Sequence, residues 1–410
     1  MNPFNKCWCR TYQLGLKVSI PMLPYREPQI LDSVSHIPGA LKKKNIRSVL
    51  LITDSGIRSR GLTRPLEQLL EEKGIHCEVY DRTVANPTSQ NVEEARILYI
   101  QQDCQAIIGF GGGSSIDCAK GVGARIARPS TPLAKMEGIL KVHHPLPLLI
   151  AVPTTAGTGS EVTVAAVITD SHTHHKYAIT DFFLIPDIAV HDPELLMSLP
   201  AGLTASTALD ALTHAVEAYI GRSTTGDSRR NALEAVRLIF RSLDTAYQDG
   251  SNLEARRDLL QASYLAGQAF SVSYVGYVHA IAHSLSGKYN LPHGYANAVL
   301  LPWVLEAYGG AIHKKLQELA VAAGIAPEDS VPSIAAAAFI RAIRNMNRRF
   351  SIPCYFKEIR EEDIPQLAKT ADHEANPLYP VPVLMNRHQL EQLYRQVMAS
   401  HHGVRMEEIA

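Results

Sequence analysis

The sequence lacks the charge imbalance and the long apolar runs that mark several classes of protein. Its 40 Lys and Arg residues balance 40 Asp and Glu residues, and no basic block is present that would track a phosphate backbone. No stretch reaches the roughly 18 apolar residues of a membrane-spanning helix, and the N-terminus shows no apolar signal-peptide core. We therefore expect a cytoplasmic protein without nucleic-acid or membrane partners.

Cysteine is also scarce, and its spacing excludes two further classes. The six cysteines are scattered, without the paired spacing of a zinc ribbon or the density of a disulfide scaffold. They are interpreted as free thiols in a reducing compartment. A GxGxxG dinucleotide fingerprint is absent as well. The length of 410 residues exceeds what one hydrophobic core usually serves, which favours two domains.

The two parts of the chain differ in their apolar periodicity. From about Arg47 to Val190, short β-branched runs such as SVLLITD, AIIGF and LLIAVP alternate with helical patterns, which is typical of a parallel sheet covered by helices. After about Leu199, apolar residues recur three and four positions apart, as in LTASTALDALTHAVEAYI. The sequence predicts an α/β domain over residues 1–198 and an all-helical domain over 199–410.

A glycine run follows one of the predicted strands. In AIIGFGGGSSIDCAK, Gly111, Gly112 and Gly113 separate a buried strand from a helix that begins near Ser114. Glycines let backbone N–H groups approach a pyrophosphate, and a helix N-terminus favours its negative charge. A tight strand-to-helix turn remains an alternative for this run by itself.

Two other strand ends carry candidate nucleotide-binding side chains. Asp54 ends SVLLITD, where a carboxylate can bind the adenosine ribose hydroxyls and repel a 2′-phosphate. AVPTTAGTGSEVT offers hydroxyls after another strand. A helix cap or turn at Asp54 and a polar turn in the threonine segment are the simpler interpretations.

The helical part contains acidic and histidine residues at ligand spacing. Asp210 and His214 are four residues apart on a helical pattern, and so are His279 and His283, with His293 following in a Pro-His-Gly turn. Each histidine alone is more often structural than a ligand. Together, an acidic residue and several histidines on apolar helices are costly to bury unless a divalent cation neutralises the carboxylate.

Six motifs in this order resemble the iron-dependent (group III) alcohol dehydrogenase family, over roughly Leu50 to beyond Pro302. They are TD at Asp54, ANPT at Ala85 to Thr88, GGGSSID at Gly111 to Asp117, PTTAGTGSEVT at Pro153 to Thr163, DALTHAVE at Asp210 to Glu217, and HAIAHSL with LPHGYANA. The resemblance implies an NAD-binding N-terminal domain, a helical metal-binding domain and an active site in the cleft between them. The first forty-odd residues match no motif of the family.

The resemblance also implies roles for individual residues. Metal ligands fall on Asp210, His214, His279 and His293, whereas His283 matches a residue near the nicotinamide. Cofactor contacts fall on Asp54, Asn86, Gly112, Gly113, Ser114, Asp117, Thr154, Thr155, Thr158, Thr163 and Lys176.

The implied reaction is metal-assisted hydride transfer between NAD(H) and a small primary alcohol or its aldehyde, with His283 relaying a proton or orienting the substrate. Oxygen and nitrogen ligands without a thiolate allow Fe²⁺ or Zn²⁺, and the resemblance favours iron. A homodimer or larger homo-oligomer is expected. The alternative is an NAD- and metal-dependent lyase similar to dehydroquinate synthase, but such a site needs converging cations, and only Lys288 and Arg222 lie near these motifs.

Overall fold

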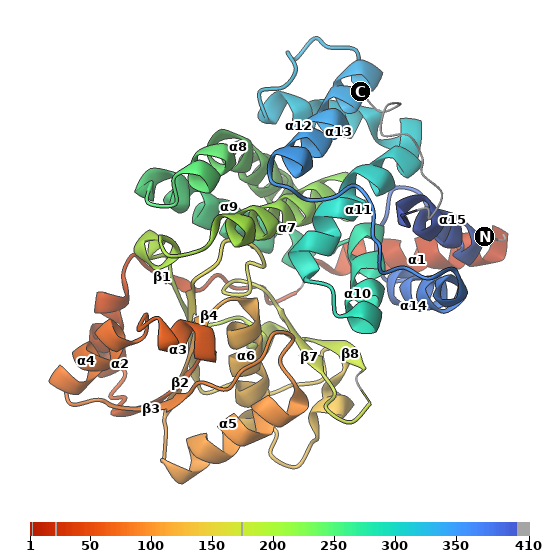
Figure 1. The fold of residues 1–410 in the computed structure, drawn as a ribbon. Coiled ribbons are helices and arrows are strands. Elements are labelled where there is room, and N and C mark those ends of the chain that lie inside the picture. The colour runs from red at the N-terminus through yellow and green to blue at the C-terminus, as the bar shows by residue number, and fades with distance from the viewer. Residues whose placement is uncertain (2, 21–22, 174, 400–410) are drawn as a thin grey trace.

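The computed structural model describes residues 1, 3–20, 23–173 and 175–399. It has two parts that follow each other along the chain (Figure 1). A parallel sheet with its covering helices forms the lower part of the view, and the long helices from α7 onward form the upper part. This arrangement confirms the predicted α/β part followed by a helical part.

The main sheet has six parallel strands, in the order β1-β9-β6-β4-β2-β3. Buried runs such as SVLLI and AIIGFG form its centre, because a strand covered on both faces must be apolar throughout. In sheet order the strands are β1 (Gln29–Leu31), β9 (Ile188–Val190), β6 (Leu148–Pro153), β4 (Ala106–Gly111), β2 (Ser48–Ile52) and β3 (His76–Tyr80).

Helices cover both faces of this sheet. One apolar cluster joins strand residues to α5 (Ser89–Gln101) and α6 (Gly113–Ala127), and a second joins them to α2 (Ile37–Lys43) and α4 (Arg64–Glu72). The chain passes from β2 to the edge strand β3 and returns to the other side of β2 as β4. Ligands of doubly wound sheets bind beyond the carboxyl ends of the strands at such a reversal.

A second, three-stranded sheet lies beside the first and was not predicted from the sequence. It has the order β5-β8-β7, with an antiparallel β7–β8 pair. Its strands are β5 (Gly138–Ile139), β7 (Ala165–Thr169) and β8 (Lys176–Thr180). The hairpin places Lys176 at the start of β8, where it can reach back to the main sheet.

The helical part is built around α7, which is buried over most of its length. One continuous apolar cluster runs from α7 to the C-terminal helix, so this half has a single core. Its helices are α7 (Ala201–Ile220), α8 (Gly226–Gln248), α9 (Leu253–Ser273), α10 (Tyr277–Tyr289), α11 (His293–Tyr308), α12 (His313–Ala322), α13 (Pro332–Arg349), α14 (Ile364–Ala375) and α15 (Arg387–Val397).

The N-terminal segment, for which no motif was found, forms helix α1 (Pro3–Ser19) against the helical half. Arg10 donates to the carbonyls of Val381 and Pro382, and Gln13 donates to the carbonyl of Tyr379 at 2.7 Å. Helix α1 therefore comes first in the sequence but packs against the helical half, which follows the sheet half along the chain. The domain boundary between residues 198 and 199 stays a prediction.

Candidate metal and cofactor site

Three helices bring the four predicted ligands together. Asp210 and His214 lie one turn apart on α7, His279 lies in the first turn of α10, and His293 is the first residue of α11. Each side chain offers one ligand atom, and these atoms all lie within 4.8 Å of one another. Residues 210 and 293 are separated by 83 positions in the sequence, so it is the packing of α7 against α10 and α11 that makes this cluster.

The electrostatics of the cluster fit a divalent cation. Burial raises the pKa of the Asp210 carboxyl and lowers the pKa values of the His214 and His293 imidazoles well below 6.5. Neutral imidazoles and a carboxylate are the species that bind Fe²⁺ or Zn²⁺. The Nδ1 atom of His293 is buried without a hydrogen-bond partner among the described residues. A cation would offset the cost of burying the Asp210 charge.

A buried carboxylate that the sequence reading did not assign holds one ligand in place. His279 Nδ1 lies 2.6 Å from Glu217 Oε2, and Glu217 also accepts the backbone N–H groups of Gly276 and Val278 at 2.8 Å. With Nδ1–H donated to Glu217, the Nε2 lone pair of His279 is left for a metal. The signal was present in the sequence, because Glu217 is two helical turns after Asp210 and three residues after His214, on the same face of α7.

Asn297 on α11 is a second residue that the sequence reading missed. Its amide nitrogen lies 2.6 Å from Asp210 Oδ1, 3.2 Å from His279 Nε2 and 3.1 Å from His293 Nε2. Three of the four ligand side chains therefore converge on one point. Asn297 follows His293 by one helical turn, so spacing alone places the two on one face.

His283 lies beside the ligands but bonds elsewhere. Its ring stacks on that of His293, with 5.0 Å between centroids, while its Nδ1 lies 2.7 Å from Glu374 Oε1 on α14. The same carboxylate oxygen accepts the Tyr379 hydroxyl at 2.7 Å. The structure thus brings His283 to the edge of the metal cluster, as expected of a residue facing the same cleft.

Asp54, the glycine run and the threonines at positions 154, 155 and 158 follow the carboxyl ends of three neighbouring strands, β2, β4 and β6. A Cβ added to Gly113 would lie 2.7 Å from the Thr158 side chain, and one added to Gly112 would lie 3.4 Å from that of Thr155. The glycine run and the threonine loop therefore touch, at the point where α6 begins. Gly111 has a φ of +149°, which a side chain would strain.

Asp54 lies next to this glycine run and also caps a helix. Its Oδ1 accepts the backbone N–H of Ile57 at 3.0 Å, so it is the N-cap of the short helix α3 (Ser55–Ser59). Its Oδ2 lies 3.5 Å from where a Gly111 Cβ would be. The cap uses Oδ1, which leaves Oδ2 for the predicted ribose contact, so the two interpretations are compatible.

Three more predicted cofactor residues form a hydrogen-bonded chain. Lys176 Nζ donates to Asn86 Oδ1 at 2.8 Å, and the Asn86 backbone N–H donates to Ser114 Oγ at 3.3 Å. Asn86 has a φ of +58°, a conformation that Asn tolerates better than most residues. Burial lowers the pKa of Lys176. The hairpin β7–β8 is thereby tied to the glycine loop.

Asp117 and Thr163 make contacts that hold α6 to the second sheet. Asp117 Oδ2 accepts the backbone N–H of Val167 at 3.0 Å, and Thr163 Oγ1 accepts from the buried Lys120 at 3.0 Å. Thr154 is buried, and its hydroxyl is without a partner among the described residues. Asp117 and Thr163 thus already have protein partners, although the Oδ1 atom of Asp117 is buried without one among the described residues.

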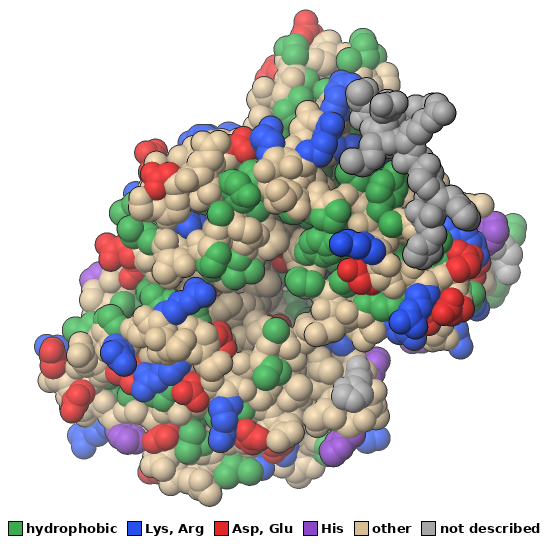
Figure 2. Space-filling view, viewed as in Figure 1, with side chains coloured by type: hydrophobic (Ala, Val, Ile, Leu, Met, Phe, Trp, Pro, Cys, Tyr) green, Lys and Arg blue, Asp and Glu red, His purple; other side chains and the backbone are tan. Residues whose placement is uncertain are grey.

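The two halves meet at the threonine loop. A Cβ on Gly157 would lie 2.8 Å from Cβ of Thr207 on α7, and one on Gly159 would lie 2.8 Å from the Ser263 carbonyl on α9. Figure 2 shows the face of the molecule hollowed between the sheet part and the helical part. The cofactor loops and the metal cluster therefore border the same junction.

Comparison with known proteins covers nearly the whole chain. The model of the "Iron-containing alcohol dehydrogenase" family matches residues 30–193, and the "Fe-containing alcohol dehydrogenase family, C-terminal" model matches residues 204–398. The chain belongs to the iron-containing alcohol dehydrogenase family. Residues 1–29, which include α1, lie outside both matches.

Individual relatives agree with this membership. Alcohol dehydrogenase 4 of Saccharomyces cerevisiae (strain YJM789) is 39% identical over 339 residues, covering 82% of this chain and 87% of the relative. The 1,3-propanediol dehydrogenase of Klebsiella pneumoniae is 38% identical over 354 residues, covering 85% and 91%. A crystal structure of 1,3-propanediol oxidoreductase superposes with a TM-score of 0.87 at 35% identity, covering 92% of this chain and all of that one.

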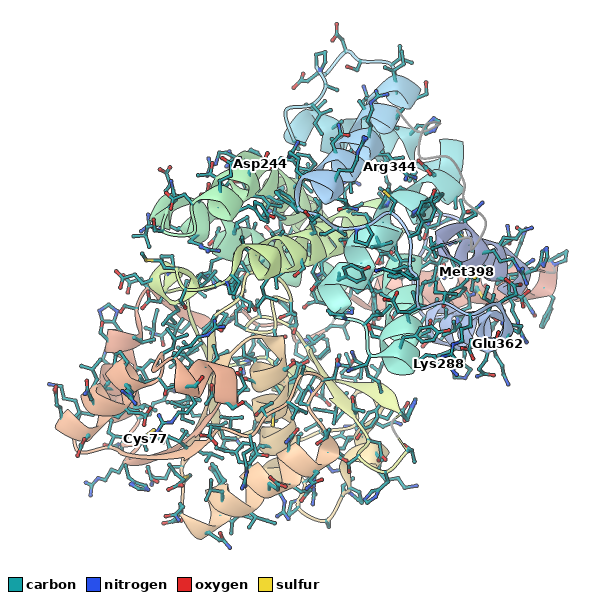
Figure 3. The ribbon with its side chains drawn as sticks, in the orientation of Figure 1. Cys77, Asp244, Lys288, Arg344, Glu362 and Met398 are labelled. Atoms are coloured by element: carbon teal, nitrogen blue, oxygen red, sulfur yellow. The ribbon has the colours of Figure 1, made fainter. Side chains whose placement is uncertain are left out.

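Family membership supports NAD-linked, metal-dependent alcohol and aldehyde oxidoreduction and does not favour the lyase alternative. The structure agrees, because the cations near the motifs do not converge on the cluster. Lys288, at the outer end of α10 in Figure 3, pairs with Asp363 at 2.9 Å, and Arg222 is exposed. Among the described residues, no helix has the length and apolar character needed to cross a membrane.

Proposed function

We propose that this protein interconverts a small, uncharged primary alcohol and its aldehyde with NAD(H), at a single divalent metal held by Asp210, His214, His279 and His293. The observation that carries the proposal is the convergence of these four ligand atoms within 4.8 Å. The family favours Fe²⁺, whereas the oxygen and nitrogen donors by themselves also suit Zn²⁺.

When bound, the metal would polarise the substrate oxygen and the nicotinamide would exchange hydride with the substrate carbon. The protein residues then have separate tasks. Glu217 orients His279, and the glycine run at the start of α6 offers backbone N–H groups to the pyrophosphate. Asp54 binds the adenosine ribose through Oδ2. His283 orients the substrate or relays its proton.

The surroundings of the cluster support the choice of substrate class. His214 lies between the rings of Phe270 and His279, at centroid distances of 4.2 and 4.4 Å, so part of the wall is aromatic. The charged groups near His283 are the carboxylates of Asp210 and Glu374, and the cation Lys176 is engaged by Asn86. Because the metal would neutralise Asp210, the Glu374 carboxylate is the one that disfavours phosphorylated and dicarboxylate substrates through like-charge repulsion.

We also propose a cytoplasmic homo-oligomer. The six cysteines are free thiols, which supports a reducing compartment. The outer face of α1 exposes Phe4, Trp8, Leu14 and Val18, and apolar side chains gathered in this way support a subunit contact.

Anaerobic purification with elemental analysis, followed by a screen of aldehydes with NADH, tests this function. We expect stoichiometric metal and the highest kcat/KM for short aliphatic aldehydes. A much higher kcat/KM for a phosphorylated or dicarboxylate substrate would show that the proposed substrate class is wrong. If iron is the native metal, air should inactivate the enzyme and anaerobic Fe²⁺ should restore it, whereas an air-stable, fully active zinc enzyme would count against iron.

A further inference from the structure

Helix α10 carries two histidines that face carboxylates in the same way. His279 and His283 are one turn apart, and the Nδ1 of each lies against a glutamate, at 2.6 Å from Glu217 and 2.7 Å from Glu374. The two glutamates come from different helices, α7 and α14, so the pairing is not a consequence of one repeated local motif. A histidine–glutamate hydrogen bond of the same kind therefore occurs twice around one site.

The two pairs differ in their burial and in what remains free. The His279–Glu217 side chains are 3% and 1% exposed, whereas the His283–Glu374 side chains are 26% and 28% exposed. His279 Nε2 points into the ligand cluster, where the Asn297 amide contacts it. His283 Nε2 has no hydrogen-bond partner among the described residues, so it is available to a molecule in the cleft.

Glu374 is itself held in place. Tyr379 donates its hydroxyl to the same Oε1 that faces His283, and Tyr379 is fixed by its backbone N–H bond to the Ala375 carbonyl at 2.7 Å. Burial alone would raise the pKa of Glu374, but His283 and the hydrogen bonds from His283 and Tyr379 lower it. The carboxylate is therefore an ionised acceptor, which fixes the proton of the facing imidazole on Nδ1.

We propose that Glu374 is a positioning residue for the reaction. By accepting the Nδ1–H of His283, it holds the ring in the tautomer whose Nε2 lone pair faces the substrate, so that Nε2 accepts a hydrogen bond from the alcohol hydroxyl. This inference rests on the proposed function and deepens it. It assigns the recognition of a neutral hydroxyl group to a Tyr379–Glu374–His283 chain outside the metal ligands.

A purely structural role for Glu374 leads to a different expected result in the substitution experiment. In that case its carboxylate only supports the packing of α14, through its hydrogen bond with Tyr379, and its loss would have the same cost whichever residue occupies position 283. A positioning role acts through His283 alone. The two roles are separated by measuring the effect of Glu374 substitutions with and without the histidine.

The experiment is a double-mutant cycle on the metal-loaded enzyme, using Glu374→Ala, Glu374→Gln, His283→Ala and the double variant Glu374→Ala/His283→Ala. We expect Glu374→Ala to lower kcat/KM for oxidation of the alcohol with NAD by about 10–100-fold, the range typical of residues that orient a site histidine. The KM for NAD and the metal content should not change. Glu374→Gln should recover most of the loss, because its amide oxygen still accepts Nδ1–H. The double variant should be no worse than His283→Ala.

Glu362 provides a matched control, because its exposed carboxylate lies just before α14 and away from the site (Figure 3). Glu362→Ala should behave as the wild type. The proposal is overturned if Glu374→Ala costs the same factor whether or not His283 is present, or if Glu374→Gln recovers nothing.

A second readout does not depend on activity. In the zinc-loaded enzyme labelled with ¹⁵N-histidine, His283, assigned by its absence in His283→Ala, should show the Nδ1–H tautomer in the wild type and a mixed or reversed tautomer in Glu374→Ala. An unchanged tautomer in Glu374→Ala contradicts the proposal. A wild type without NAD-linked activity would show that the proposed function is wrong. The tautomer measurement would still decide whether Glu374 positions the His283 ring.

Discussion

The sheet half and the helical half contribute chemically different groups to the site. In the sheet half, most of the predicted contacts are backbone groups, glycines and hydroxyls at strand ends, where Gly112, Gly113 and the threonine loop approach one another. In the helical half, they are ionisable side chains on apolar helices, and Asp210, His214 and His279 are all buried. The first arrangement costs little without its ligand, whereas the second buries charge that a cation must offset.

This contrast implies that loss of a single side chain has unequal effects in the two halves. A ligand substitution removes a large share of the binding energy for one ion, whereas the cofactor spans many weak contacts. Single substitutions should therefore impair metal binding without impairing cofactor binding, or the reverse.

The largest expected effect is at the metal ligands. Asp210→Ala and His279→Ala should each abolish tight metal binding and activity, while NADH binding remains largely intact because the glycine loop lies in the other half. Bound metal and NADH fluorescence measure the two properties on the same samples. Asp244→Ala is a suitable control, since this exposed acid of α8 pairs with Arg349 on the surface (Figure 3). Stoichiometric metal in either ligand variant would disprove the ligand assignment.

A smaller effect is expected at Glu217, which orients a ligand without being one. Glu217→Gln keeps the shape of the side chain but loses the charge that fixes His279 Nδ1–H, and we expect metal affinity to fall by about 10–100-fold. Competition with a chelator measures this affinity. Unchanged affinity would mean that Glu217 only closes the N-terminus of α10 through the backbone N–H groups of Gly276 and Val278.

In the sheet half, Asp54 should set the cofactor preference for NAD(H) over NADP(H). Asp54→Gly should raise NADPH use and lower NADH use, each by about 1–3 kcal/mol, because it removes both the repulsion of a 2′-phosphate and the ribose hydrogen bonds. The same change replaces the N-cap side chain of α3 by glycine, which costs only about a few tenths of a kcal/mol of stability.

Asp54→Asn separates these two effects, since Asn also caps helices but carries no charge. It should shift the ratio of kcat/KM for NADH and NADPH at nearly unchanged thermal stability. A ratio that stays constant in both variants would make Asp54 a helix cap alone.

The last effect is on stability alone and concerns a buried acid of the sheet half. Burial raises the pKa of Glu161 from its ordinary 4.5 to about 7, although Lys120 lowers it in part. Because this folded-state pKa is above the unfolded one, stability is full below about pH 4.5 and declines as the pH rises to about 7. Glu161→Gln should remove this decline in a series of thermal melts, and an identical pH profile in the variant would show that Glu161 does not titrate in this range.

Sequence patterns predicted the order of the elements well, for a physical reason. Central parallel strands and a helix buried like α7 must be apolar, so SVLLI, AIIGF and the DALTHAVE segment are marked by composition and period. The second sheet was missed because β5 has only two residues, and because β7 and β8 are buried only at alternate positions, without the continuously buried run of the equally short β2.

The residues of the site were predicted less completely than the order of the helices and strands. The residues of the metal cluster were identified because histidines and acids at ligand spacing are conspicuous on an apolar helix. Glu217 and Asn297 were not identified although each shares a helix face with a ligand, so spacing could have indicated them. Glu374 was not identified because it acts through a contact with a distant segment that spacing does not reveal. The individual cofactor contacts stay predictions, and the Glu374 pair, which joins residues 283 and 374, required the packing of α14 against α10.

The most direct test of the central claim is reconstitution of the metal-free protein. Wild type and Asp210→Ala are stripped with a chelator, reloaded anaerobically with increasing Fe²⁺, and assayed for bound metal and for NADH-dependent reduction of a short aldehyde. The account predicts that wild-type activity rises in proportion to bound metal and stops at one ion per chain, while the variant gains neither. Full activity in the metal-free wild type, or equal activation of Asp210→Ala, would contradict it.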